Sequence, residues 1–214
     1  MRDRSLRDRL VEVGVELVAQ HGPNSLTVRE IARRAGVSHG APRRYFPTHS
    51  ALLAAIAWEG YRTLGVLVSR VVDGEDTDPR TQLLALGRTY LHFAQANRGM
   101  FELMFRHDLL RGNQIGLREH SLPLFGVLID VVARARPSIA GTGAAAVTAG
   151  ALWANLHGIA QLWQWESLQT AVESGDVEPL LRATVDAHLG RSDVPCRWPS
   201  PTDRPTVTDR EGQT

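Results

Sequence analysis

The sequence predicts an all-α protein, and three observations carry that prediction. Apolar residues recur along most of the chain at the three-to-four-residue spacing of amphipathic helices. Runs of β-branched residues, which are typical of strands, are scarce, and aromatic residues are only 6% of the composition. Hydrophobic residues at 43% and charged residues at 22% are typical of a folded chain rather than a disordered one.

Charge is distributed unevenly along the 214 residues, although the formal net charge at pH 7 is only +1. Residues 1–49 contain nine Arg against five Asp and Glu residues, whereas the remaining residues contain fifteen against eighteen. So small a net charge excludes a protein that coats nucleic acid by charge alone. A basic end and a larger, mildly acidic remainder indicate two parts with different tasks.

The first helix is predicted over residues 6–21. Ser5, followed three residues later by Asp8, is a plausible cap, and the Gly22-Pro23 pair ends the segment. The apolar face of this helix is formed by Leu6, Leu10, Val13 and Leu17. The two acidic residues within the apolar run, Glu12 and Glu16, argue against a signal peptide.

Two short helices follow. Thr27 and Glu30 have the spacing of a capping box, in which each side chain binds the backbone amide of the other residue. They open a short helix that Gly36 stops. Ser38 is predicted to cap the next helix, which runs to about residue 46, where Pro47 closes it.

Ser50 is predicted to cap a long helix over residues 51–72, which an acidic loop at 73–78 ends. Pro79 then occupies the first position of the next helix, a position where proline is favoured. Further helices are predicted over 79–97, 100–110, 118–135, 144–170 and 178–189. The chain therefore divides into an N-terminal domain of short helices (1–50), a helical domain (51–190) joined to it by the long helix, and a tail (191–214) whose composition predicts disorder.

Residues 26–53 predict a helix-turn-helix, in which two short helices meet at a tight turn formed by residues 35–37. Gly36 fits that turn, because the chain leaves a helix through a left-handed backbone conformation. Residues with a Cβ adopt this conformation only at a steric cost, and glycine has none. The second helix would enter a major groove, where arginines bind guanine and hydroxyls and free amides bind phosphates. The candidate DNA-binding residues are Thr27, Arg29, Ser38, His39, Gly40, Ala41, Arg43, Arg44, Tyr45 and His49.

This stretch resembles the tetracycline-repressor (TetR) family of bacterial transcriptional regulators. The resemblance covers roughly residues 5–56 and is carried by Thr27-Val-Arg-Glu-Ile-Ala32, Ala35-Gly-Val-Ser38, Gly40, Tyr45-Phe46 and Leu52-Leu53. The remainder resembles the variable helical ligand domain of that family. More narrowly, Ala41-Pro-Arg-Arg-Tyr-Phe46 and Trp153-Ala-Asn-Leu-His-Gly158 resemble a subgroup that has a Trp…His-Gly motif in its ligand domain.

Three positions depart from the family pattern. The family usually has Leu, Tyr and Lys where this sequence has Pro42, Arg43 and His49. Pro42 falls in the first turn of the predicted recognition helix. There it removes only one backbone hydrogen bond, which contributes little, so we expect the helix to persist. Arg43 keeps a donor and adds charge, whereas His49 weakens one phosphate contact at neutral pH.

The resemblance implies a homodimer in which the last two helices of each subunit form a four-helix bundle. Helices 144–170 and 178–189 fit such an interface. The first does so through its small residues and an apolar stripe, part of which must pack inside the protomer: Ala144, Ala145, Ala146, Gly150 and Ala151, then Leu152, Leu156, Ile159 and Trp163. A two-fold dimer predicts a roughly palindromic operator, with recognition helices about 34 Å apart. A small molecule bound within residues 79–170 would favour a swung long helix, and the dimer would release DNA.

Candidate ligand-binding residues form two groups. Met100, Phe101, Met104 and Phe105 recur at helical spacing, either as ordinary core or as the lining of an apolar cavity, where Met adapts to varied shapes. Trp153 and His157 lie four residues apart on one helix face, so His157 is either a structural residue or a polar group that orients a ligand. No cofactor is predicted. No metal is predicted either, because the histidines lie on separate helices and Cys196 is alone.

These observations predict a cytoplasmic, dimeric DNA-binding regulator, which we expect to be a repressor released by a small apolar molecule. An alternative interpretation is a DNA-binding regulator controlled by a protein partner rather than a small ligand. An enzyme that uses His157 in a helical cavity is a remote alternative, because no carboxylate–His spacing or nucleophile motif supports catalysis. The least polar segment, residues 144–163, contains Thr, Asn, His and Gln, so it is interpreted as a packed helix rather than a membrane span.

Overall fold

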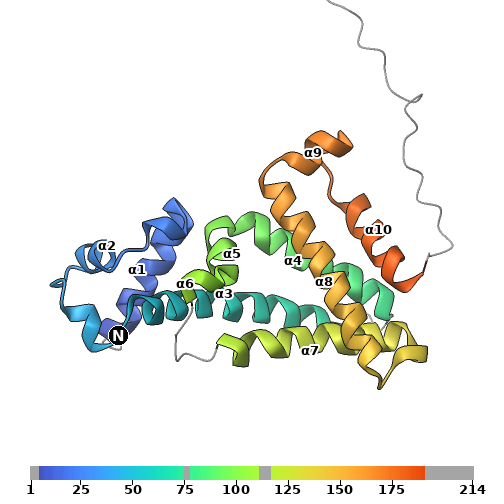
Figure 1. The fold of residues 1–214 in the computed structure, drawn as a ribbon, viewed down its shortest axis with the longest axis horizontal. Helices are drawn as coiled ribbons and strands as arrows, with labels where there is room; N and C mark the ends of the chain where they lie inside the picture. The colour runs from blue at the N-terminus through green and yellow to red at the C-terminus, as the bar shows by residue number, and fades with distance from the viewer. Residues whose placement is uncertain (1–4, 75–77, 111–116, 191–214) are drawn as a thin grey trace, which may run out of the picture.

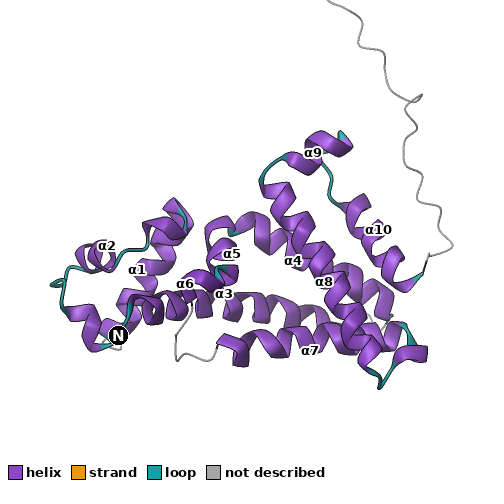
Figure 2. Ribbon diagram, in the orientation of Figure 1, coloured by secondary structure: helices purple, strands orange, loops and turns teal. Residues whose placement is uncertain are grey.

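The computed structural model describes residues 5–74, 78–110 and 117–190, and within these ranges it contains helices and no strand (Figures 1 and 2). The predicted all-α fold is confirmed. The predicted disordered tail, 191–214, lies outside the described residues. The helices are α1 Leu6–His21, α2 Val28–Arg34, α3 His49–Val72, α4 Pro79–Ala96, α5 Arg98–Phe105, α6 His107–Leu110, α7 Leu117–Ala135, α8 Gly143–Gln164, α9 Ser167–Val172 and α10 Glu178–Leu189, with 3₁₀ turns η1 Pro23–Ser25, η2 Ala41–Arg44 and η3 Pro137–Ile139.

An N-terminal body is formed by α1, α2, η2 and the first turns of α3, at the left of Figure 1. Its core is fully apolar and almost entirely closed to solvent, and it includes Leu10, Leu17, Ile31, Phe46, Leu52 and Ile56. Burial of these side chains removes apolar surface from water, which stabilises the small body. The body therefore holds a fixed shape around the turn that follows α2.

The C-terminal body surrounds the second half of α3. Helix α7 runs alongside α3, and α4 packs against α3, α7, α8 and α10 (Figure 1). Helix α10 buries Leu181 and Val185 and is tied to α4 by the Arg80–Asp186 and Arg88–Glu178 ion pairs. The long helix α3 is thus a structural member of both bodies.

Helix α3 is, among the described residues, the one segment long and apolar enough to cross a membrane by length and composition. Half of its most apolar window is buried inside the fold. Its apolar residues have packing partners on α1, α4, α5 and α7, as expected for a central helix.

Helix α5 joins the two bodies, because it packs on α1 as well as on α3. A Cβ on Gly99, at the start of α5, would lie 2.1 Å from the carbonyl oxygen of Val18 in α1. That neighbour is backbone and cannot rotate away, so only glycine permits this close approach. Helices α5 and α1 are therefore in close backbone contact at this position.

Predicted helix starts are confirmed at three caps. The side chains of Ser5, Thr27 and Asp78 accept hydrogen bonds from the backbone amides three residues further on, at 3.2, 3.1 and 2.8 Å. Helix α3 differs from the prediction, because Thr48 rather than Ser50 is its cap. The long helix therefore begins two residues earlier than predicted.

The predicted continuous helix 144–170 is broken after Gln164. Glu166 has a left-handed backbone, with φ of 61°, and α9 begins only at Ser167. The side-chain amide of Gln169 donates to the carbonyl of Trp163 at 2.8 Å, so a side chain satisfies one of the end groups of α8. The predicted helix 100–110 is also divided, into α5 and α6.

Candidate DNA interface and ligand cavity

The turn after α2 is set by two backbone hydrogen bonds that close the helix. The amide of Gly36 donates to the carbonyl of Arg33 at 3.2 Å, and the amide of Val37 donates to that of Ala32 at 3.0 Å. Gly36 has a φ of 66°, the left-handed conformation that this pair of bonds requires. The predicted role of Gly36 is confirmed, and the chain leaves α2 toward residues 38–46.

The segment after this turn is not the α-helix predicted from Ser38. Residues 41–44 form the 3₁₀ turn η2, and the amide of Ala41 donates to the carbonyl of Ser38 at 3.0 Å. The prediction was wrong because Pro42 has no amide hydrogen with which to continue an α-helical ladder. A hydrogen bond from the backbone amide of Phe46 to the carbonyl of Pro42, at 2.8 Å, closes the segment.

Two buried residues anchor the recognition segment, which we define as residues 38–45. Pro42 is buried, and Phe46, which follows the segment, is only 4% exposed. The guanidinium of Arg7 lies over the Phe46 ring, 5.4 Å from its centroid. With these residues turned inward, the solvent-exposed positions of the segment are Ser38, His39, Gly40, Arg43, Arg44 and Tyr45, and Ala41 is half-buried.

The arginines around this segment fall into two groups. Arg33 and Arg34 pair with Glu30, at 2.7 and 2.9 Å. Hydrogen bonds from Arg33 and Arg34 lower the pKa of Glu30 to about 2. Of the predicted DNA-binding arginines Arg29, Arg43 and Arg44, none forms an ion pair within the part of the chain that the structure describes.

The predicted capping box is only half formed, because Glu30 is engaged with Arg33 and Arg34. The backbone amide of Thr27 donates instead to the carbonyl of Ser25, at 2.8 Å. The Thr27 side chain does cap α2, as predicted.

His49 has a partner that the sequence did not indicate. It is the first residue of α3, and its Nε2 bonds the carbonyl oxygen of Leu26, just before α2. Because a carbonyl only accepts, the ring donates from Nε2. The histidine thus fastens the start of α3 to the start of α2.

An apolar cavity of about 290 Å³ lies in the C-terminal body. Helices α3, α4, α7 and α8 supply most of its walls, and α5 supplies Phe105. The lining residues are Tyr61, Leu64, Val68, Leu83, Leu86, Gly87, Tyr90, Phe105, Ser121, Leu122, Leu124, Phe125, Val127, Leu128, Trp153 and Leu156.

The six predicted ligand-binding residues separate into two sets. Phe105 and Trp153 line the cavity, and their ring centroids are 6.1 Å apart. His157 lies behind them and contacts Phe105, with ring centroids 4.5 Å apart. The other three, Met100, Phe101 and Met104, are core residues that are buried, and the two methionines pack over Gly60 of α3.

A hydrogen-bonded chain of three side chains links the cavity wall to His157. The indole Nε1 of Trp153 donates to the hydroxyl of Tyr90 at 3.3 Å, and that hydroxyl lies 2.8 Å from Nδ1 of His157. Burial lowers the pKa of His157 and raises the pKa of Tyr90, so both groups are held neutral. Elsewhere in the cavity wall, the buried hydroxyl of Tyr61 donates to the carbonyl of Met104 at 2.9 Å, and burial raises the pKa of Tyr61 to about 12.

Sequence reasoning missed both cavity tyrosines and the whole contribution of α7. Tyr61 and Tyr90 each stand among apolar residues of a predicted helix, but helical spacing alone does not show which faces meet around a cavity. The available signal was that buried tyrosines need a partner for their hydroxyl groups.

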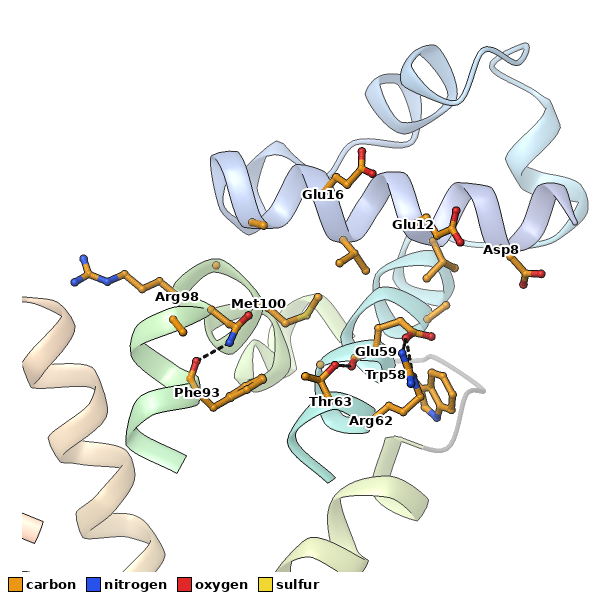
Figure 3. Close-up of a pocket in the computed structure, with 18 of the residues that line it drawn as sticks. Asp8, Glu12, Glu16, Trp58, Glu59, Arg62, Thr63, Phe93, Arg98 and Met100 are labelled. Atoms are coloured by element: carbon orange, nitrogen blue, oxygen red, sulfur yellow. Dashed lines mark hydrogen bonds and ion pairs between the residues drawn. The ribbon is translucent and has the colours of Figure 1, made fainter. Parts of the chain in front are cut away.

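A larger cleft of about 950 Å³ is lined by residues of α1, α3 and the junction of α4 with α5 (Figure 3). Its walls carry many charged side chains, namely Arg7, Asp8, Glu12, Glu16, Glu59, Arg62 and Arg98. Glu59 and Arg62 pair across one turn of α3 at 2.8 Å. An apolar molecule gains little binding free energy among charged side chains. The smaller, apolar cavity is therefore the candidate ligand site. In the described part of the chain, no three His, Cys, Asp or Glu side chains converge as a metal site would require.

An outward-facing basic segment on a helix-turn-helix, joined by one long helix to an all-helical body, defines a DNA-binding transcriptional regulator. Two family models match this chain. The model described as "Bacterial regulatory proteins, tetR family" matches residues 10–56, and "Tetracyclin repressor-like, C-terminal domain" matches residues 83–188. The chain therefore belongs to the TetR family of regulators, as its sequence motifs predicted. The narrower Trp…His-Gly subgroup stays a prediction.

Individual relatives are distant. The nucleoid occlusion factor SlmA of Glaesserella parasuis is 28% identical over 114 residues, which are 51% of this chain and 56% of that protein. The chain thus spans about half the length of the curated relatives it matches. A solved protein of unknown function from Rhodococcus sp. RHA1 is 28% identical, with a TM-score of 0.73 over 88% of this chain and 95% of that one. The fatty acid degradation regulator FadR from Bacillus halodurans, at 18% identity and a TM-score of 0.61 over 89% and 97%, shares the fold.

Proposed function

We propose that this protein is a cytoplasmic, homodimeric repressor that binds a roughly palindromic operator and releases it when a small molecule occupies the apolar cavity. The observation that carries the proposal is the position of α3. Residues near its start hold the recognition segment in place, and Tyr61, Leu64 and Val68 further along it line the cavity. A ligand that shifts the second half of α3 therefore moves the recognition segment.

Exposure and charge support DNA contact through residues 38–45. Arg43 and Arg44 project from η2 without an ion-pair partner among the described residues, so they are available for guanine or phosphate. Gly40 and Ala41 are small, so the backbone comes close to the DNA, while Ser38, His39 and Tyr45 supply further donors. Thr27 and Arg29 lie at the start of α2, where free amides favour a phosphate. His49 supports this surface indirectly, because its Nε2–H donates to the carbonyl of Leu26 and holds the start of α3 beside the start of α2.

A dimer is supported by the exposed face of α8. Val147 is 73% exposed and Leu162 is 39% exposed, and Ala151 and Ala154 between them are exposed too. These four residues follow helical spacing, and the small side chains of the two alanines allow a second helix to approach closely. Leu152, Leu156 and Trp163 from the predicted stripe are buried within the protomer, so they stabilise the subunit itself.

Selection of random duplexes by the purified full-length protein tests this function. We expect the recovered sites to be roughly palindromic, with half-sites centred about one turn of DNA, about 34 Å, apart. Sedimentation of the protein alone is expected to give a dimer. A protein with intact helices by circular dichroism that retains no duplex at low ionic strength would overturn the proposal.

A further inference from the structure

The walls of the cavity carry no charged side chain among the described residues that line it. Their polar groups are three hydroxyls, on Tyr61, Tyr90 and Ser121, and the indole N–H of Trp153. A charged ligand would lose its hydration here without gaining an ion-pair partner. The cavity therefore selects against cations and anions alike.

The hydroxyl of Tyr61 is already committed. It is buried and donates to the carbonyl of Met104 at 2.9 Å, on the side of α3 that packs against α5. A ligand that took this proton would leave a buried carbonyl unpaired, which is unfavourable. Tyr61 therefore acts as an aromatic wall.

The hydroxyl of Tyr90 can form one more hydrogen bond, and only as an acceptor. Its proton needs an acceptor in apolar surroundings, and Nδ1 of His157 stands 2.8 Å away, so we assign the proton to this bond. Its oxygen accepts from Trp153 at 3.3 Å, and a hydroxyl oxygen has two lone pairs. The unused lone pair can only accept, so a ligand at Tyr90 must donate.

Size and shape narrow the ligand further. A volume of 290 Å³ holds on the order of ten water molecules, which is space for a single substituted ring. The lining includes the rings of Phe105, Phe125 and Trp153, with 6.1 Å between the centroids of Phe125 and Trp153. Such walls favour offset and edge-to-face contacts with a flat aromatic ligand. Leu122 and Trp153, which are 60% and 39% exposed, mark the side on which the cavity meets solvent.

We propose that the cavity binds an uncharged monocyclic aromatic molecule, of the size and chemistry of an alkylphenol, which donates a hydrogen bond to the Tyr90 oxygen. This inference rests on the proposed function, because it names the class of effector that the cavity would sense. Tyr90 is the residue that determines specificity, while Trp153 and His157 fix the orientation of its hydroxyl group.

Calorimetric titration of the full-length protein at pH 7.5, without DNA, tests the inference with four probes of similar shape. These are 4-ethylphenol, 4-ethylanisole, 4-ethylbenzoate and 4-ethylbenzylammonium. We expect 4-ethylphenol to bind at least about tenfold more tightly than 4-ethylanisole, which cannot donate, in keeping with one hydrogen bond of about 1.4 kcal/mol. The two ions are expected to bind at least tenfold more weakly than 4-ethylanisole, the weaker of the neutral probes.

Two tyrosine variants form a matched pair. Tyr90→Phe is expected to abolish the preference for 4-ethylphenol over 4-ethylanisole while it still binds both. Tyr61→Phe removes a hydroxyl from the same cavity but not the acceptor, so it is expected to keep the preference. Thermal melts establish that each variant is folded, and the comparison of probes on the unaltered protein does not depend on either.

Tighter binding of 4-ethylanisole or of either ion, or no binding by any of the four probes, would overturn the inference. Because these titrations contain no DNA, their failure leaves the duplex selection unaffected. Conversely, a protein that ignored every duplex but bound 4-ethylphenol through Tyr90 would contradict the proposed function alone.

Discussion

The two halves of α3 have opposite surroundings. In the first half, the side chains that face the N-terminal core are tightly packed: Ile56 is fully buried, and a Cβ on Gly14 of α1 would lie 2.2 Å from its Cδ1. In the second half, Tyr61, Leu64 and Val68 border a cavity of about 290 Å³. A close-packed body transmits displacement, whereas a cavity offers alternative arrangements. Under the proposed function, we therefore expect a structural change to start around the cavity and to move the N-terminal body as a unit.

Truncation of a large aromatic residue tests this contrast most strongly. Phe46→Ala is expected to lower the free energy of unfolding by about 3–5 kcal/mol, because it opens a void in the closed N-terminal core. Phe125→Ala, at the half-buried wall of the cavity, is expected to cost less than half as much. Urea denaturation followed by circular dichroism measures both. Equal losses for the two variants would contradict the difference in packing.

Arg43→Ala tests the outward face of the N-terminal body. If Arg43 reads a base, the loss in operator binding is about 1–3 kcal/mol, with relaxed preference at one position. If it contacts phosphate, binding weakens on all sequences and the salt dependence becomes shallower. Arg33→Ala is the matched control, because Arg33 is held by Glu30, and its effect is expected to be several-fold smaller. Fluorescence anisotropy over a salt series distinguishes these outcomes, and unchanged binding by Arg43→Ala would show that residues 38–45 do not meet the DNA.

Glu30→Gln is expected to have a smaller effect in the opposite direction. The hydrogen bonds from Arg33 and Arg34 hold the pKa of Glu30 near 2, so the carboxylate is ionised at any working pH. Its removal frees two guanidinium groups on α2, and non-specific duplex binding should strengthen, with a salt slope steeper by about one for each of the two that reaches a phosphate. Glu16→Gln, which removes the same charge from α1, should not change the slope. A duplex of random sequence is the appropriate ligand for both.

The stability of the C-terminal body, which contains the cavity, should depend on pH through His157. Burial places the folded-state pKa of His157 below its unfolded value of about 6.5. The unfolded chain therefore takes up the proton first, and stability contributed by the neutral ring is lost as pH falls from about 6.5 toward the folded pKa. His157→Gln does not titrate but can accept from Tyr90, so its melting temperature should fall less between pH 7.5 and 5. Parallel melting curves for the two proteins would contradict a neutral, buried imidazole.

The N-terminal body could be predicted well from the sequence, because its determinants are local. Ser5 and Thr27 cap their helices, and Gly36 takes the left-handed conformation that the turn requires. The extent of the recognition helix could not be predicted, because η2 results from competition between the Ser38 cap and Pro42. Both signals were present in the sequence, and the missing amide of Pro42 prevailed.

The cavity could be predicted only in part, because its walls come from segments far apart in the sequence. Phe105 and Trp153 were identified from helical spacing, but so were Phe101 and Met104, which face the closed core. One periodic stripe does not reveal which of its members meets another helix. The break after Gln164 was missed for a different reason, since Glu166 takes a left-handed backbone although it is neither Gly nor Pro.

Operator binding in the presence of a cavity ligand tests the central claim most directly, namely that α3 couples the cavity to the recognition segment. Fluorescence anisotropy with the selected operator would be measured at increasing concentrations of whichever ethyl-substituted probe binds the protein most tightly. We expect saturation of the cavity to weaken operator affinity by about 5–150-fold, equivalent to a coupling free energy of about 1–3 kcal/mol. An operator affinity that stays constant while calorimetry shows the cavity to be filled would contradict the account.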